Sequence, residues 1–154
     1  MNTIDISYDD AFNKKLAPKK FVLEYLNLVL EKLELKNVEF SVSFINEQNM
    51  HELNSEYRNI DDSTDILSFA AEDEESDFSF IRVGKRKRVL GDMLICPEVL
   101  LRNAKAFSVS ESEELRRLLI HGVLHLSGEN HESNDVTIEP MLQKQEKILS
   151  ELTL

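Results

Sequence analysis

The stretch Leu118–Leu126, with the sequence LLIHGVLHL, limits the possible folds of this chain more than any other. As a helix it is apolar on every side except at His121 and His125. A helix that is hydrophobic all round is a buried helix, because each of its faces must be removed from water. The fold must therefore bury this helix, and the two histidines must lie in the interior or on the wall of a cleft.

Strand and helix patterns alternate along the rest of the chain. Patterns typical of strands occur in residues 2–8, 38–45, 64–70 and 87–97. Helical spacing of apolar residues occurs in 18–37, 46–59, 97–107, 111–127 and 134–151. Strands interleaved with helices are typical of an α/β protein. We predict a single domain over residues 1–154, with a mixed four-stranded sheet packed with about five helices.

The size and the cysteine content narrow the class of protein further. The chain has 154 residues, the usual size of one domain. Cys96 is its only cysteine, which excludes an intramolecular disulfide and a cysteine-rich zinc cluster. The N-terminus MNTIDISYDD lacks the features of a secretory signal, and no apolar run approaches the roughly 18–20 residues of a membrane span. These features predict a soluble protein in the cytoplasm with no membrane partner.

The net charge of −11 argues against indiscriminate binding to nucleic acid, which depends on a positive surface. The charge is unevenly spread, however. Acidic residues gather in AEDEESD (71–77), and basic residues gather in KKLAPKK (14–20) and GKRKR (84–88). Charge runs of this kind usually form solvated loops or surfaces, and composition alone favours that interpretation here.

Three of the four histidines lie in HGVLHLSGENH, residues 121–131. His121 and His125 project from the same face of the expected helix one turn apart, close enough for two nitrogens to hold one metal ion. Gly128 can end the helix, because glycine adopts left-handed backbone conformations at little cost. His131 can then turn back and supply a third ligand. The spacing predicts a metal site formed by these three histidines.

Three imidazoles are neutral ligands, so they leave the charge of a zinc ion uncompensated and a fourth coordination position open. This arrangement is typical of a catalytic zinc site rather than a structural one. Zinc in such sites lowers the pKa of its bound water to about 7. We therefore expect one Zn²⁺ per chain and a hydrolysis or a related nucleophilic displacement.

A metallopeptidase is one alternative, because metzincin peptidases share this spacing in the motif H-E-x-x-H-x-x-G-x-x-H. In those enzymes the glutamate after the first histidine is the general base. Gly122 occupies that position here and cannot accept a proton. The peptidase hypothesis is therefore a distant second.

Three stretches of the chain match one known family pattern in the same order: LNSEYRNIDDSTDILSF (53–69), VLGDMLI (89–95) and HGVLHLSGENH (121–131). They resemble the motifs L-N-x-x-Y-R, D-x-P-T-D-V-L-S-F-P, L-G-D-I and H-G-x-L-H-L-x-G-Y-D-H of the YbeY family. Members of this family are bacterial metal-dependent endoribonucleases of rRNA maturation. The match is highly specific.

The resemblance implies a zinc-dependent, single-strand-specific endoribonuclease that acts in maturation of the small-subunit rRNA 3′ end and in ribosome quality control. The implied metal ligands are His121, His125 and His131. Arg58 is the implied catalytic and substrate-binding residue, and its planar guanidinium suits bidentate binding of a phosphate. We also expect Arg86 and Arg88, in the basic cluster, to hold the RNA backbone outside the cleft.

A second hypothesis is a metal-containing ribosome assembly factor without nuclease activity of its own. The net charge of −11 favours it, because an acidic protein binds naked RNA poorly at ordinary salt. In this case a partner supplies the RNA contacts. The expected partners are rRNA and, beyond it, ribosomal proteins or a ribosome-associated GTPase.

The chain departs from the family pattern at four positions. Ser63 and Ala70 stand where the pattern has prolines, which affects loop rigidity only. Glu129 and Asn130 replace Tyr-Asp before the last histidine. The missing aspartate bears on the mechanism if it orients a ligand or a water molecule. The three ligand positions are intact.

Three further polar residues have two interpretations each. Asp92, in the middle of an apolar strand, either supports a metal ligand or satisfies a helix terminus. Thr64 and Asp65 either line the cleft or cap a turn. Gly91, beside Asp92, indicates close approach of another backbone.

Overall fold

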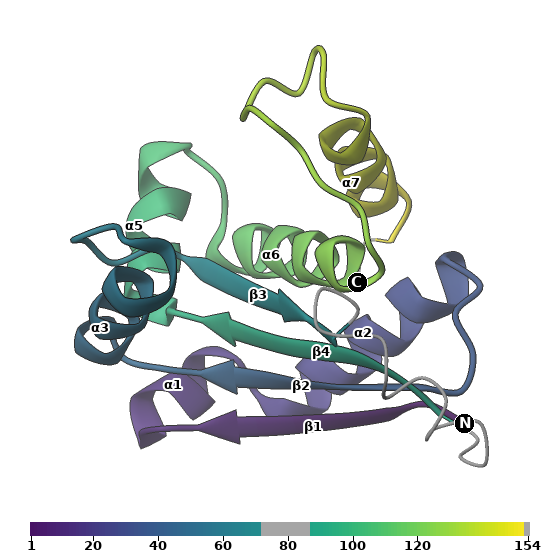
Figure 1. Cartoon of the computed structure of the whole chain (residues 1–154), viewed down its shortest axis with the longest axis horizontal. Helices are drawn as coiled ribbons and strands as arrows, with labels where there is room; N and C mark the ends of the chain where they lie inside the picture. The colour runs from purple at the N-terminus through teal and green to yellow at the C-terminus, as the bar shows by residue number, and fades with distance from the viewer. Residues whose placement is uncertain (72–86, 153–154) are drawn as a thin grey trace.

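The computed structural model describes residues 1–71 and 87–152. Its strands are β1 (Thr3–Tyr8), β2 (Val38–Phe44), β3 (Ile66–Ala70) and β4 (Arg88–Ile95). They form one sheet in the order β1-β2-β4-β3 (Figure 1). β1, β2 and β4 are parallel, whereas β3 runs antiparallel to β4. The expected mixed four-stranded sheet is confirmed.

The described residues contain the five expected helices and a short additional one. The helices are α1 (Ala11–Leu16), α2 (Lys19–Lys32), α3 (Glu47–Arg58), α5 (Pro97–Ala106), α6 (Glu111–Leu126) and α7 (Pro140–Glu151). α1 was not expected, because its six residues give less than two turns of periodic signal. Its N-terminus is capped by Asp10, whose carboxylate accepts a hydrogen bond from the backbone N–H of Asn13.

Helix α2 ends earlier than the sequence pattern predicts. Its last residue is Lys32, whereas the pattern extended to residue 37. Glu34 and Asn37 have φ angles of 57° and 55°, which a right-handed helix does not allow. The chain turns after Lys32, and the N–H of Leu35 closes this turn by donating a 2.9 Å hydrogen bond to the carbonyl of Leu30.

Helix α7 begins later than predicted, at Pro140 instead of residue 134. Proline suits the first turn of a helix, because the N–H that it lacks would have no helical partner there. The residues before it form a turn instead. The carboxylate of Glu139 accepts hydrogen bonds from the N–H and the hydroxyl of Ser133, at 3.1 and 2.8 Å.

The helix expected to be buried is α6. It lies against β3 and β4 and also contacts α2, α5 and α7 (Figure 1). Its buried residues are Glu114, Leu115, Leu118, Leu119, Ile120, Gly122, Val123, Leu124 and Leu126. An added Cβ at Gly122 would lie 2.3 Å from Cε of Met93 on β4. The missing side chain at this position therefore lets α6 approach the sheet closely.

The sheet face opposite α6 is more polar. Asp92 lies on that face, because it alternates with Met93 along β4. It is exposed, and its carboxylate accepts a 2.6 Å hydrogen bond from the hydroxyl of Ser41 on β2. Both sequence interpretations of Asp92 were therefore wrong. The expectation for Gly91 is confirmed, because an added Cβ there would lie 2.1 Å from the carbonyl oxygen of Phe69.

Helices α3 and α5 pack together at one end of the sheet (Figure 1). A small apolar cluster lies there, formed by Met50, Leu67, Cys96 and Val99. The carboxylate of Glu47, in the first turn of α3, accepts a 2.9 Å hydrogen bond from Nη1 of Arg102 on α5. These contacts fix the helix that ends at Arg58. No helix in the described residues is long and apolar enough to cross a membrane.

Candidate metal centre

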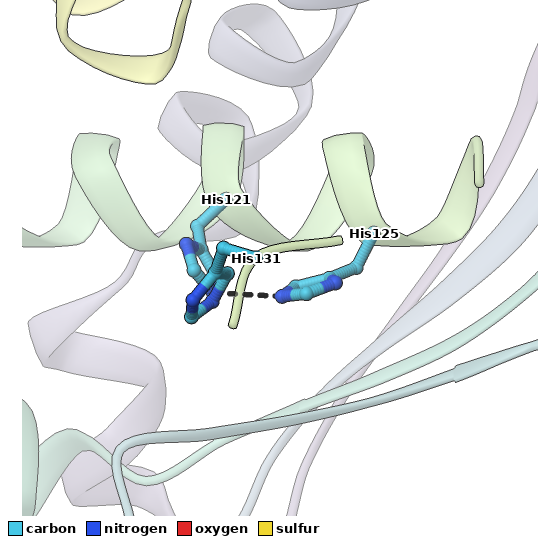
Figure 2. Close-up of side chains that lie close together, drawn as sticks. All are labelled: His121, His125 and His131. Atoms are coloured by element: carbon cyan, nitrogen blue, oxygen red, sulfur yellow. Dashed lines mark hydrogen bonds between the residues drawn. The ribbon is translucent and has the colours of Figure 1, made fainter. Parts of the chain in front are cut away.

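Three histidines converge beside α6. His121 and His125 project from the same side of this helix, and His131 reaches back toward them from the following loop (Figure 2). One ligand nitrogen from each ring lies within 4.8 Å of the other two. The Nε2 atoms of His121 and His125 are 3.1 Å apart. These three residues can therefore hold one metal ion between them.

The loop that returns His131 begins with the turn expected at Gly128. This glycine has a φ of 106°, and its N–H donates to the carbonyl of His125 at 3.0 Å. The N–H of Glu129 donates to the carbonyl of Leu124 at 3.0 Å. Together these two bonds form a Schellman motif, which ends α6 and reverses the chain.

Hydrogen bonds at the outer nitrogens orient two of the rings. Nδ1 of His121 lies 2.6 Å from Oε1 of Gln145 on α7, and Nδ1 of His131 lies 2.7 Å from the carbonyl oxygen of Ser133. Both oxygens are acceptors, so each Nδ1 carries the proton. The Nε2 lone pairs are then free to coordinate a metal ion.

A second hydrogen bond fixes the orientation of the Gln145 amide. Its Nε2 donates to Oε2 of Glu146 at 3.0 Å, so the amide oxygen is the atom that faces His121. The Glu146 carboxylate in turn accepts two hydrogen bonds from Arg117 on α6, at 2.9 and 3.1 Å. A chain of hydrogen bonds therefore runs from the metal centre through α7 and back to α6.

The electrostatic environment keeps two imidazoles neutral. Burial lowers the pKa of His121. Burial and the neighbouring imidazoles lower the pKa of His125 to about 4. Neutral imidazole is the form that binds a metal ion. The donor set, three imidazole nitrogens beside an open space, suits a divalent transition metal ion with a free coordination position.

A cavity of about 240 Å³ lies on one side of the histidines, and we call it the Arg58 cavity. Its lining residues are Arg58, Ile66, Leu67, Ser68, Ala70, His121, His125 and Asn130. Nη2 of Arg58 donates to the carbonyl oxygen of Ser68 at 3.0 Å, and its guanidinium lies 5.0 Å from the centre of the Phe69 ring. Arg58 is thus held at the edge of the space that the histidines face.

The Arg58 cavity also contains the hydroxyl of Ser68 and the amide of Asn130. The hydroxyl of Ser68 is buried and has no hydrogen-bond partner among the described residues. Asn130 lines this cavity together with His125. Its amide occupies the position before His131 at which the family pattern places an aspartate.

A larger cavity, of about 630 Å³, is lined by His121 and His131. We call it the acidic cavity, because its lining includes Asp65, Glu114 and Glu146. Ile66 and His121 line both cavities, so the two spaces meet at the metal centre. Thr64 and Asp65 line the acidic cavity, as one of their two interpretations expected.

Comparison with known proteins decides the family. The family model described as endoribonuclease YbeY matches residues 4–153. The chain belongs to the YbeY family. An endoribonuclease YbeY of Treponema denticola is 38% identical, over 96% of this chain and 92% of that protein. A YbeY of Borreliella burgdorferi is 38% identical, over 90% of both chains.

A solved structure supports the YbeY fold. The solution structure of TM1509 from Thermotoga maritima is similar, with a TM-score of 0.64 and 31% sequence identity. The similarity covers 97% of this chain and 88% of that chain. The relatives named YbeY are endoribonucleases, that is, hydrolases that act on RNA.

The structure of this YbeY-family chain places some of the predicted site residues in the site and others outside it. The three histidines come together, and Arg58 lines one cavity with His121 and His125, although it lies 63 positions before His121 in the sequence. Arg86 lies outside the described residues. Arg88 is exposed at the start of β4 and is not part of the lining of either cavity. The roles of all these residues in binding and catalysis stay predictions.

Sequence reasoning missed Gln145 and Glu114. Both are buried, although both are polar, with exposed fractions of 6% and 3%. The sequence contained a signal for each residue, because each interrupts an apolar stripe of its helix. Gln145 follows Met141 and Leu142 on α7, and Glu114 precedes Leu115 on α6. A polar residue on a buried helix face needs a partner, and that requirement marks a candidate position.

Proposed function

We propose that this chain is a zinc-dependent, single-strand-specific endoribonuclease. We propose further that it acts in the cytoplasm, in maturation of the small-subunit rRNA 3′ end and in ribosome quality control, as one hydrolase domain over residues 1–154. The observation that supports the proposal best is the cluster of three imidazoles, two of which line one cavity together with Arg58. Membership of the YbeY endoribonuclease family supports it as well.

The proposed metal ligands are His121, His125 and His131, each through Nε2. When bound there, zinc supplies Lewis-acid chemistry at the phosphodiester. The hydrogen bonds from His121 to Gln145 and from His131 to Ser133 hold two of the rings in the tautomer that this binding requires.

Arg58 is the proposed phosphate-binding and catalytic residue. Its guanidinium carries several N–H donors in one plane, and the bond to Ser68 uses only Nη2. The remaining donors are available for a phosphate oxygen. The Phe69 ring beneath the guanidinium limits its motion, so the charge is already placed before RNA binds. The Ser68 hydroxyl is a further donor or acceptor in the same cavity.

Arg86 and Arg88 are the proposed contacts for the RNA backbone outside the cleft. They belong to the basic cluster GKRKR, in a chain whose net charge is −11. A local positive surface of this kind reduces the repulsion between an acidic protein and RNA. The proposed partners besides rRNA are ribosomal proteins or a ribosome-associated GTPase.

The net charge also favours a second candidate function, a metal-containing ribosome assembly factor without nuclease activity. Electrophoresis of labelled single-stranded rRNA fragments with the purified protein distinguishes the two. Chelator-sensitive cleavage restored by zinc is expected for the nuclease. Binding without cleavage at full zinc content supports the assembly factor. A peptidase has little support, because Gly122 faces Met93 and offers no general base.

The proposed role of Arg58 is tested by its replacement. Arg58→Ala should reduce RNA cleavage about a hundredfold or more, the scale of losing one charge-stabilising donor. Because Arg58 is exposed, the free energy of unfolding should change by only about 0.5 kcal/mol. Arg58→Lys should restore part of the activity, since an ammonium group keeps the charge without the planar fork.

Cleavage rate, melting temperature and zinc content are measured together for this test. Lys36→Ala, at an exposed cation before β2, is the control and should cleave like the wild type. Zinc content should be unchanged in all variants, because none alters a ligand. Wild-type cleavage by Arg58→Ala would remove the phosphate-binding role.

A further inference from the structure

The acidic cavity is a second space beside the three histidines, and it adjoins the Arg58 cavity at Ile66 and His121. It extends from His121 and His131 to the end of α5, at Asn103 and Phe107. Its volume of about 630 Å³ is more than twice the 240 Å³ of the Arg58 cavity. A substrate whose phosphate lies beside Arg58 therefore has room in the adjoining cavity for a larger group.

The charge of this cavity excludes a second phosphate. Its lining contains the carboxylates of Asp65, Glu114 and Glu146, and Arg117 is the only arginine or lysine that the described residues contribute to it. Arg117 already donates to Glu113, Glu114 and Glu146. The cavity therefore has an excess of negative charge. Among the parts of an RNA chain, it favours a neutral group that donates hydrogen bonds over a phosphate.

Asp65 is the carboxylate best placed to receive such donors. No cation binds it among the described residues; its side-chain partners are Thr64, at 3.4 Å, and Nδ2 of Asn103, at 3.3 Å. Both side-chain bonds are long, and a carboxylate has about four acceptor positions. Asp65 can therefore accept further N–H groups.

Phe107 provides a flat apolar surface in the same cavity. Its exposed fraction is 63%, and it belongs to neither apolar cluster of the core. It is the C-cap residue of α5, so the end of a helix fixes its backbone. Exposed aromatic rings beside polar groups are typical stacking surfaces for the bases of single-stranded RNA.

We propose that the acidic cavity binds the nucleobase adjacent to the scissile phosphate, with the base stacked on Phe107 and its amino N–H groups donated to Asp65. This inference rests on the proposed endoribonuclease function. Cytosine, adenine and guanine carry an exocyclic amino group and uracil does not. The cavity therefore discriminates against uracil at this position.

The test uses short unstructured RNAs that are identical except at one base, with cleavage followed under steady-state conditions. Phe107→Ala should raise KM about tenfold or more for every base, the scale of losing one stacked base, with little change in kcat. Phe107→Trp should restore KM. Asp65→Asn should remove the preference against uracil, because an amide offers both a donor and an acceptor.

The controls are Phe12→Ala and Asp5→Asn, at exposed residues outside both cavities. Both should keep the wild-type KM and base preference. Melting temperatures identify a variant that does not fold, and Phe107, which is mostly exposed, can be replaced without loss of core contacts. Wild-type KM in Phe107→Ala together with unchanged base preference in Asp65→Asn would overturn the inference.

A binding measurement separates this inference from the proposed function. RNA with 2-aminopurine at the variable position should lose fluorescence on binding, and Phe107→Ala should reduce this quenching. Quenching that depends on Phe107 without any cleavage by the wild type would overturn the nuclease function and support the base site. Cleavage with quenching that is independent of Phe107 would overturn the base site alone.

Discussion

At the scale of single residues, the metal centre depends on groups that do not touch the metal position. The amide oxygen of Gln145 fixes the tautomer of His121, and Glu146 fixes the orientation of that amide. Such partners of metal-bound histidines typically change metal affinity 10- to 100-fold when they are lost. Gln145 is therefore a positioning residue, whose effect is best seen in metal binding.

Gln145→Met should weaken zinc binding about 10- to 100-fold, because methionine fills a similar volume but leaves the Nδ1–H of His121 without an acceptor. Gln145→Glu keeps an acceptor and should stay within a few-fold of the wild type. Competition with a chromophoric chelator measures the affinity. Gln143→Met, at an exposed position on the same helix, is the control. Wild-type zinc affinity in Gln145→Met would contradict the positioning role.

At the scale of helices and strands, the contact between α6 and β4 places the histidines over the sheet. Gly122→Leu should lower the free energy of unfolding by about 1–3 kcal/mol, because the added side chain overlaps Met93. In a Met93→Ala background the same replacement should cost clearly less. Chemical denaturation of the wild type, the two single variants and the double variant measures the coupling between Gly122 and Met93. Equal costs in both backgrounds would show that the close approach is unimportant.

The contact between α3 and α5 makes stability depend on pH. The hydrogen bonds from Arg102 and Ser63 lower the pKa of Glu47 to about 2, from an ordinary value of 4.5. Between about pH 2 and pH 4.5, Glu47 is therefore protonated more often in the unfolded chain than in the folded protein. The contribution of Glu47 is complete above about pH 4.5 and is lost as the pH falls toward 2.

Glu47→Gln should accordingly lower the free energy of unfolding by about 1 kcal/mol at pH 7, a modest value because the pair is partly exposed. The difference from the wild type should shrink steadily between pH 4.5 and 3. Urea unfolding at a series of pH values measures it. A difference that stays constant over this range would contradict the assignment.

At the scale of the whole molecule, a metal ion held by the three histidines would join α6 to the loop before α7, because His131 lies on that loop. Zinc at a hundred times its dissociation constant should stabilise the fold by about 2.7 kcal/mol. For a protein of this size, this corresponds to a rise in Tm of roughly 5–10 °C. Calorimetry with a chelator and with added zinc measures the shift. His131→Ala should abolish most of it, and a full shift in this variant would contradict the three-histidine site.

The sequence alone determined the parts of this protein that depend on local patterns. The apolar LLIHGVLHL predicted the buried helix α6, because burial follows from the side chains on all of its faces. The histidine spacing and Gly128 predicted the cluster of three imidazoles, because three histidines within eleven residues are brought together by one helix and one turn. The order of strands along the chain predicted a mixed sheet with attached helices.

The tertiary structure alone decided what depends on contacts between distant segments. Strand pairing placed Asp92 on the polar face beside Ser41, and no local pattern distinguishes that face from the face against α6. The packing of α7 on α6 brought Gln145 to His121 across 24 residues of chain. The acidic cavity is likewise formed by parts of α5, α6, α7 and the start of β3. The energy of such contacts exists only once the chain has folded, so the sequence shows the residues but not their partners.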